Sequence, residues 1–137
     1  MSRTIAFTHE DASRLDVAGG KGASLARSAR ALPVPPGLIV TSEAYRAFLE
    51  PLEAAIAALL DEAESADQAA APIQDLILGV EPDHEWMMEL EDSLTRHDLA
   101  RYPLAVRSSG TMEDLPGAAF AGQHDTFLGE RGATAVA

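Results

Sequence analysis

The sequence predicts an α+β fold that is rich in helices and has one small mixed or antiparallel sheet. Two observations support this prediction. Apolar side chains recur at helical spacing between residues 20 and 97, whereas short runs of strand-forming residues stand near 38–41, 104–107 and 124–128. We expect these three runs to pair. With 137 residues, 47% of them apolar and 23% charged, the chain has the length and composition of one soluble globular domain.

The first third of the chain predicts a strand, a helix and a second strand. Residues 4–7 form a short run with strand propensity. A helix is expected over 20–32, because Leu25, Ala29 and Leu32 recur at helical spacing, and Pro33 ends it. After a stiff proline-rich turn, residues 38–41 are typical of a short buried strand.

Prolines divide the helical middle of the chain. Thr41 or Ser42 can cap a helix that we expect to be interrupted at Pro51, where another helix begins. Residues 63–71 are rich in Ala, Asp, Glu and Gln, and we expect a solvated connection there. Two more helices are predicted to begin at Pro72 and Pro82; in the second, Trp86, Leu90 and Leu94 are spaced by four.

The last third returns to strand-like patterns. Residues 103–106 predict a strand that leads into Arg107, and residues 125–128 could form the returning strand. Between them runs a polar segment that contains several glycines. Residues 129–137 carry no signal that closes a domain, so we interpret the chain as part of a longer protein.

Composition excludes several classes of function. The formal charge of −12 disfavours binding to nucleic acid or to an anionic membrane surface, although basic residues could still converge on a small anion. There are no cysteines, and the four histidines show no metal-ligand spacing. The N-terminus lacks the apolar run of a signal peptide, and the longest apolar run, residues 54–60, is too short to span a bilayer. We therefore expect a cytoplasmic protein.

The first candidate site is the glycine-flanked Lys21, the only lysine in the chain. A Walker A loop would need glycine at position 15 and Ser or Thr at position 22, where Leu15 and Gly22 stand; a dinucleotide fingerprint would need a small residue in place of Leu25. Two interpretations stay open. Backbone N–H groups, the helix dipole and the ammonium group could converge on an anion, or the segment could be a flexible turn with an exposed lysine.

The second candidate site runs from Arg107 to Thr126. Arginine at the end of a strand can hold a phosphate through two parallel hydrogen bonds, and the small residues that follow let backbone N–H groups approach a ligand closely. The alternative is a β-hairpin with a long, ordinary loop. Glu113 and Asp114 could coordinate Mg²⁺ or face solvent, and His124 could transfer protons or be structural.

Two long segments carry a resemblance to a known family. The first segment comprises residues 17–25 (VAGGKGASL) and 32–41 (LPVPPGLIVT), and the second comprises residues 104–117 (LAVRSSGTMEDLPG) and 120–128 (FAGQHDTFL). In this order they resemble the opening of the ATP-grasp domain in the family of phosphoenolpyruvate synthase and rifampin phosphotransferase, of which pyruvate phosphate dikinase is a more distant relative. Departures are mild: Gly110, Met112 and His124 stand where the close relatives commonly have other residues.

The resemblance implies that the whole chain, residues 1–137, is a partial N-terminal ATP-grasp domain. Lys21, Arg107, Gly122 and Thr126 would bind ATP. The second ATP-grasp half with its Mg²⁺ ligands, a phosphohistidine domain and an acceptor domain would be absent, so no catalytic residue is expected in this part. The full enzyme would move phosphoryl groups from ATP through phosphohistidine to pyruvate, water or an antibiotic, whereas this part alone should be inactive. A non-catalytic, stand-alone nucleotide-binding or docking module is the alternative.

Overall fold

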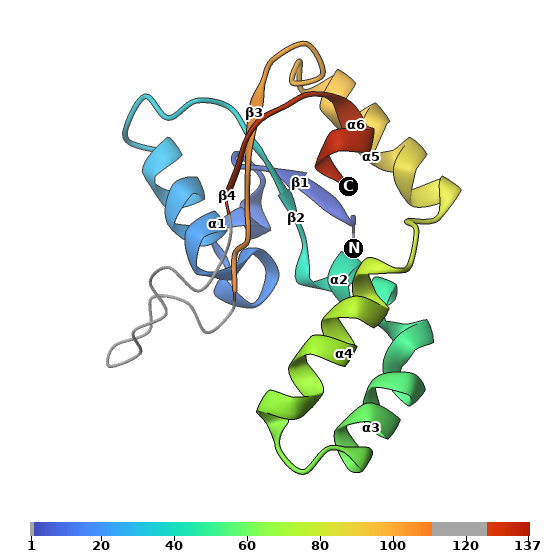
Figure 1. The fold of residues 1–137 in the computed structure, drawn as a ribbon. Coiled ribbons are helices and arrows are strands. Elements are labelled where there is room, and N and C mark those ends of the chain that lie inside the picture. Colours follow the sequence, from blue (N-terminus) through green and yellow to red (C-terminus); the bar gives the residue numbers. More distant parts are fainter. Residues whose placement is uncertain (1, 111–125) are drawn as a thin grey trace.

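A computed structural model describes residues 2–110 and 126–137 of the chain (Figure 1). Its class is α+β, helix-rich with small antiparallel sheets, as the sequence predicts. The helices and strands follow in this order: β1 (Thr4–Ala6), η1 (Glu10–Ser13), α1 (Leu15–Ala29), β2 (Leu38–Val40), α2 (Ser42–Leu49), η2 (Glu50–Leu52), α3 (Glu53–Glu62), α4 (Ala66–Leu78), α5 (His84–Arg96), β3 (Leu104–Arg107), β4 (Thr126–Glu130) and α6 (Gly132–Val136). Here η1 and η2 are single 3₁₀ turns.

The described strands form two separate sheets, which corrects the prediction of one. β1 pairs with β2 in antiparallel register, with Ile5 opposite Ile39, and β3 pairs with β4, with Arg107 opposite Thr126. The predicted pairing of residues 38–41 with 104–107 is therefore wrong. The N-terminal strand, which the sequence left as an isolated possibility, pairs with one edge of β2, and β3 pairs with β4 instead.

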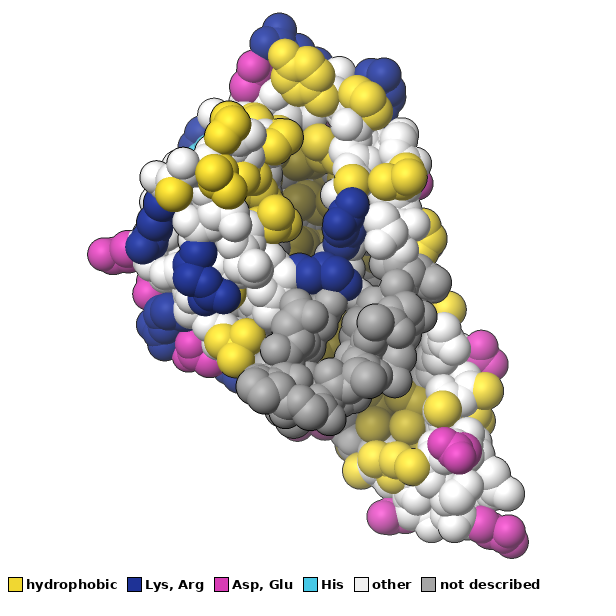
Figure 2. All heavy atoms as spheres, turned by 90° about the vertical axis from the view of Figure 1, so that its left-hand side faces the viewer, with side chains coloured by type: hydrophobic (Ala, Val, Ile, Leu, Met, Phe, Trp, Pro, Cys, Tyr) yellow, Lys and Arg dark blue, Asp and Glu magenta, His cyan; other side chains and the backbone are white. Residues whose placement is uncertain are grey.

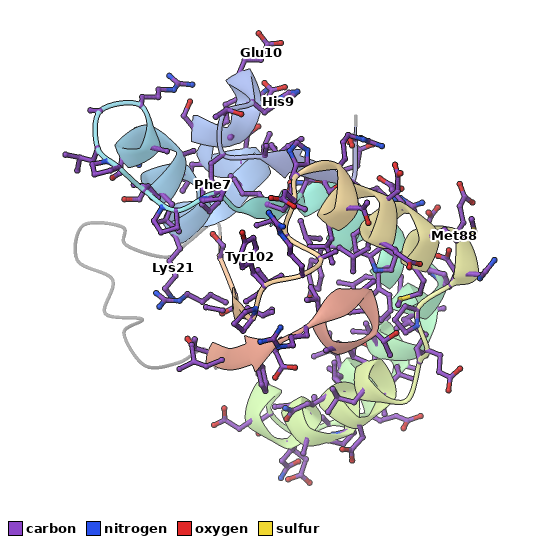
Figure 3. All side chains as sticks on the ribbon, turned by 90° about the horizontal axis from the view of Figure 1, so that it is seen from above. Phe7, His9, Glu10, Lys21, Met88 and Tyr102 are labelled. Carbon is purple, nitrogen blue, oxygen red and sulfur yellow. The ribbon has the colours of Figure 1, made fainter. Side chains whose placement is uncertain are left out.

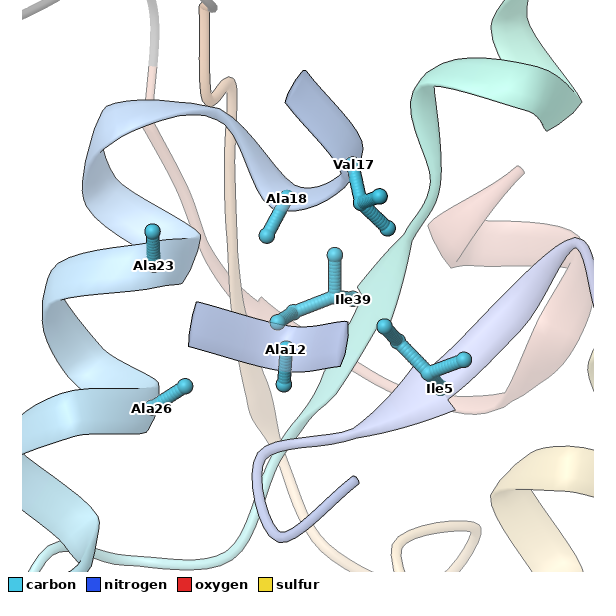
Figure 4. Packing of buried hydrophobic residues seen from close by; sticks show 7 residues of the cluster. All are labelled: Ile5, Ala12, Val17, Ala18, Ala23, Ala26 and Ile39. Carbon is cyan, nitrogen blue, oxygen red and sulfur yellow. The ribbon is translucent and has the colours of Figure 1, made fainter. Parts of the chain in front are cut away.

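One core lies between the first sheet and α1 (Figure 4). Its buried members are small or β-branched: Ile5, Ala12, Val17, Ala18, Ala23, Ala26 and Ile39. The alanines let the helix approach the sheet closely, because a larger side chain would hold the two elements apart. The N-terminal strand and the helix that carries Lys21 thus form one packed unit.

Helix α1 begins earlier than predicted and is bent. It runs from Leu15 instead of residue 20, and Gly19 (φ 68°, ψ 177°) breaks the helical backbone inside it. The apolar periodicity predicted a later start for α1, because Gly19 separates the first turn, which begins at Leu15, from the rest of the helix. The helix ends at Ala29, three residues before the predicted end at Leu32.

The middle of the chain is helical to a greater extent than predicted. Thr41 caps α2 by accepting a hydrogen bond from the Ala44 N–H, and the chain breaks at Pro51 as expected. The predicted solvated connection over 63–71 is wrong, because α4 begins at Ala66, capped by the Ser65 hydroxyl, and continues through Pro72. The cap and the run of alanines outweigh the proline, which costs this helix one hydrogen bond.

A second core joins α5 to the C-terminal elements. Leu90, Leu94 and Leu99 are buried, and Leu38, Trp86, Leu104, Ala133 and Val136 pack against them. Two polar contacts also attach α5 to β1 and to the residue before it: the Thr4 and Ser93 hydroxyls lie 2.7 Å apart, and the Arg3 Nε donates to Glu89 at 2.6 Å. The short helix α6, which the sequence did not predict, packs on α5. Among the described residues, no helix combines the length and the apolar character needed to cross a membrane.

Candidate functional site

The two segments that the sequence marked as candidate sites meet in the structure. Residues 18–22 of α1 pack against Ser109 and Gly110, which lie shortly after the end of β3. Three hydrogen bonds join them: the Gly20 N–H donates to the Gly110 carbonyl at 2.9 Å, the Gly22 N–H donates to the Ser109 Oγ at 2.9 Å, and the Ser109 hydroxyl donates to the Ala18 carbonyl at 2.7 Å. We call this contact the junction.

The junction explains why glycine occupies position 19. The backbone of Gly19 is in the left-handed region, with φ +68°, and a Cβ atom there would lie 2.0 Å from the Ser109 carbonyl oxygen. Such a separation is far inside van der Waals contact, so any side chain would push the two segments apart. Gly19 therefore serves the close approach of two backbones.

Part of the sequence interpretation of this turn needs correction. In one of the two interpretations of this turn, its backbone N–H groups would face an anion. Those of Gly20 and Gly22 instead donate to Gly110 and Ser109, so they hold the junction together. Two other features of that interpretation, the Lys21 side chain and the helix that starts after Gly19, could still attract an anion.

Lys21 is half-buried and lies between the two glycines whose amides make these bonds. Its side chain extends from α1 on the side where β3 and β4 lie (Figure 3). Arg107 is exposed at the end of β3, two residues before Ser109, and Thr126 stands opposite Arg107 in the β3–β4 register. The fold thus brings together the segments that carry Lys21, Arg107 and Thr126. The fourth predicted site residue, Gly122, lies outside the described residues, as do Glu113, Asp114 and His124. The predicted proximity of the charged tips of Lys21 and Arg107 stays a prediction.

The face that carries α1 and the β3–β4 sheet is hollowed (Figure 2). Hydrophobic side chains gather in the hollow, and lysine or arginine side chains stand at its edge. The protruding part of the molecule at the lower right of this view carries acidic side chains and shows no lysine or arginine side chain.

The excess of acidic over basic residues lies in one part of the chain. Residues 47–95, which we call the acidic segment, contain 13 of the 22 acidic residues and none of the 10 basic ones. The remainder holds 9 acidic and 10 basic residues, a net charge of +1. The formal charge of −12 therefore says little about the junction, since exposed charges beyond about 8–10 Å are largely screened at physiological salt. Counting charge by segment would have revealed this from the sequence.

An ion pair stands at the first turn of α1. Arg14 donates to Asp16 at 2.7 Å and to Asp11 at 3.1 Å. The hydrogen bond from Arg14 holds the pKa of Asp16 below its ordinary value, and the Asp16 carboxylate raises the pKa of Arg14. Both groups are solvent-exposed, so the pair stabilises the fold only weakly.

The described residues contain no group of three or more His, Asp or Glu side chains that could hold a metal ion.

The sequence analysis did not single out Ser109, whose hydroxyl makes two of the three hydrogen bonds of the junction. It was noted only as one of several small residues, because nothing in the sequence pairs it with a turn 87 residues away.

The two joined segments each contain glycine and a basic residue. Comparison with known proteins gives the family of the chain. Residues 15–137 match the family model described as "Pyruvate phosphate dikinase, AMP/ATP-binding domain". The chain belongs to this family.

Curated relatives carry two kinds of name. A probable phosphoenolpyruvate synthase of Methanothermobacter thermautotrophicus is 36% identical over 99% of this chain, and a phosphoenolpyruvate synthase of Pseudomonas aeruginosa is 37% identical over 83%. A rifampicin phosphotransferase of a Streptomyces species is 36% identical over 86%. These alignments cover 22%, 16% and 15% of the relatives, so the chain spans about a fifth of their length or less.

Proposed function

We propose that this chain is the ATP-binding N-terminal part of an ATP-dependent phosphotransferase that resembles phosphoenolpyruvate synthase or rifampicin phosphotransferase. The observation that carries the proposal is the junction. It joins the Lys21 turn to the end of β3 through three hydrogen bonds, and these are the two segments on which the family resemblance rests. Family membership supports a nucleotide as the ligand.

In this proposal, Lys21 and Arg107 contact the phosphates of ATP. An ammonium group is a compact point charge, and a guanidinium group can hold a phosphate with two parallel hydrogen bonds. Thr126, opposite Arg107 in the sheet, and Gly122 are proposed to lie at the nucleotide. The role of Gly122 rests on the resemblance alone. The near-neutral charge outside the acidic segment removes the objection that a strongly acidic chain repels ATP.

The remaining parts of the reaction belong to other parts of a longer protein. Chain 1–137 would be one portion of an ATP-grasp fold, and the second half of that fold would supply the Mg²⁺ ligands. Further domains would carry the histidine that receives the phosphoryl group and the site for its acceptor. The chain's own residues would bind and orient ATP, which contributes through positioning and charge neutralisation. We place the protein in the cytoplasm.

The test is ATP titration by calorimetry, with the 137-residue chain and with the full-length protein that carries it. We expect weak binding and no turnover for the chain alone, and tighter binding and phosphoryl transfer for the full-length protein. In the latter, Lys21→Ala or Arg107→Ala should each weaken ATP binding by roughly ten- to a hundredfold, because a charge-assisted hydrogen bond is worth about 1.5–3 kcal/mol. Unchanged affinity in either variant would refute the proposed site.

Lys21→Arg is the informative conservative change. A planar guanidinium group differs from a compact ammonium group in shape and in the directions of its hydrogen bonds, and the buried glycines on either side of Lys21 leave its backbone little room to adjust. We expect Lys21→Arg to bind ATP less tightly than the wild type. The exposed Arg27→Lys, on the same helix, is the matched control and should bind ATP as the wild type does.

A further inference from the structure

We infer that Ser109 is a positioning residue that fixes the backbone of Lys21, and thereby the place of its ammonium group at the nucleotide phosphates. The inference rests on the proposed function, since it assigns Ser109 a role in that same site. It goes further in naming the contact that joins the two halves of the site and in stating that Ser109 acts through Lys21.

The hydroxyl of Ser109 both donates and accepts a hydrogen bond. It donates to the Ala18 carbonyl at 2.7 Å and accepts from the Gly22 N–H at 2.9 Å. Ala18 precedes the break in α1 and Gly22 follows it, so one side chain bridges the bent part of the helix. Because the left-handed Gly19 lies inside this bridge, its conformation is enclosed by hydrogen bonds on both sides.

Lys21 lies between the bonded residues. The N–H of the residue before it, Gly20, donates to the Gly110 carbonyl, and the N–H of the residue after it donates to Ser109. Residues 109 and 110 thus hold the backbone on either side of Lys21. A flexible lysine side chain reaches a fixed target more readily when its Cα is held, because less conformational entropy is lost on binding.

The same bonds connect Lys21 to Arg107. Ser109 and Gly110 lie two and three residues after Arg107, the last residue of β3, so the junction ties the backbone of Lys21 to that of Arg107 through a few residues. Loss of the Ser109 hydroxyl should loosen this connection while both cations stay in the protein. Ser109 therefore acts by positioning and is not expected to touch the nucleotide.

A double-mutant cycle tests the inference. ATP affinity is measured by calorimetry in the full-length protein for the wild type, Ser109→Ala, Lys21→Ala and the double variant. Ser109→Ala alone should weaken ATP binding by roughly three- to thirtyfold, because the freed backbone around Lys21 must then lose conformational entropy when ATP binds. In the Lys21→Ala background the same change should have no further effect, because the residue that it positions is gone.

Ser42→Ala is the matched control. The Ser42 hydroxyl also donates to a carbonyl of α1, that of Asp16, at 2.6 Å, but it makes no bond with residues 18–22 among the described contacts. We expect ATP affinity to be unchanged in this variant. Thermal unfolding of each variant separates a loss of folded protein from a loss of affinity. Should Ser109→Ala not fold, Ser109→Cys replaces it in the cycle, since the thiol keeps the size but makes weaker hydrogen bonds.

Two unfavourable results can be told apart. If Lys21→Ala leaves ATP affinity unchanged, the proposed site itself is wrong, and the inference is wrong with it. If Lys21→Ala weakens binding but the Ser109 change has the same effect in both backgrounds, the site stands and only the positioning role is refuted, because a general structural role would act independently of Lys21.

Discussion

The unit formed by α1, η1 and the β1–β2 sheet and the hairpin formed by α3 and α4 differ in how they are stabilised. The first packs seven buried residues between α1, η1 and the β1–β2 sheet, and its glycine turn is bonded to residues 109 and 110. In the hairpin, the described part of α3 contains no fully buried residue and α4 contains one, Ala69. Figure 1 shows the hairpin extending away from the rest of the molecule.

This difference in burial indicates where the chain can hold a ligand. A site needs side chains that are fixed in place, and burial on several sides supplies this at the junction. The hairpin lies wholly within the acidic segment, and no basic residue there balances its acidic ones. We interpret it as a solvated appendage whose charge has little influence on the junction.

The largest expected effect concerns Gly19. Gly19→Ala forces a side chain into left-handed backbone and against the Ser109 carbonyl, so we expect the free energy of unfolding to fall by about 2–5 kcal/mol. ATP affinity should be lost with it. Gly129→Ala is the control, because Gly129 has a similar φ of +75° but no atom within 4 Å of the added Cβ. Urea denaturation should show a loss of only about 1 kcal/mol there. Equal losses would mean that the junction is not tightly packed.

The next effect separates a buried leucine from an exposed leucine in α5 and α4, two helices of the acidic segment. Leu90 in α5 is 2% exposed, and Leu90→Ala should lower the free energy of unfolding by about 2–5 kcal/mol. Leu78 at the end of α4 is 75% exposed, and Leu78→Ala should change it by less than about 0.5 kcal/mol. Chemical denaturation measures both values. A large loss for Leu78→Ala would show that the hairpin is more tightly packed than its exposure indicates.

A smaller effect is expected at the end of α3. Glu62 is an acidic residue in the last turn, where the helix dipole is negative. Glu62→Gln should therefore raise the free energy of unfolding by about 0.3–1 kcal/mol and leave ATP affinity unchanged. Thermal unfolding and calorimetry provide the two measurements. A change in ATP affinity would contradict the separation between the acidic segment and the junction.

The smallest effect is the pH dependence of the Arg14–Asp16 pair. Because the folded pKa of Asp16 is lowered, the pair stabilises the protein above the ordinary carboxyl pKa of about 4. This contribution is lost as the pH falls through the lowered folded value. The difference in melting temperature between wild type and Asp16→Asn should thus be small at pH 7 and disappear in strong acid. A difference that grows on acidification would refute this assignment.

The sequence determined much of the local structure. The break at Pro51, the cap at Thr41 and the spacing of Trp86, Leu90 and Leu94 depend on interactions between residues at most a few positions apart, and the predicted elements are present. Lys21 and Arg107 were also singled out from sequence, by their neighbours and by the resemblance. Even local signals were misjudged at Pro72, where the cap at Ser65 and the alanines allowed the helix to continue.

Only the tertiary structure decided which distant segments meet. The choice of β1 as the partner of β2, and the placing of Ser109 against the Ala18 and Gly22 backbone, depend on packing between residues that are far apart in the chain. No periodicity records such a pairing, since backbone N–H and carbonyl groups are the same in every residue and closeness to a partner is fixed by the whole fold. The sequence therefore marked both halves of the site, and the fold joined them through one serine hydroxyl and two glycine amides.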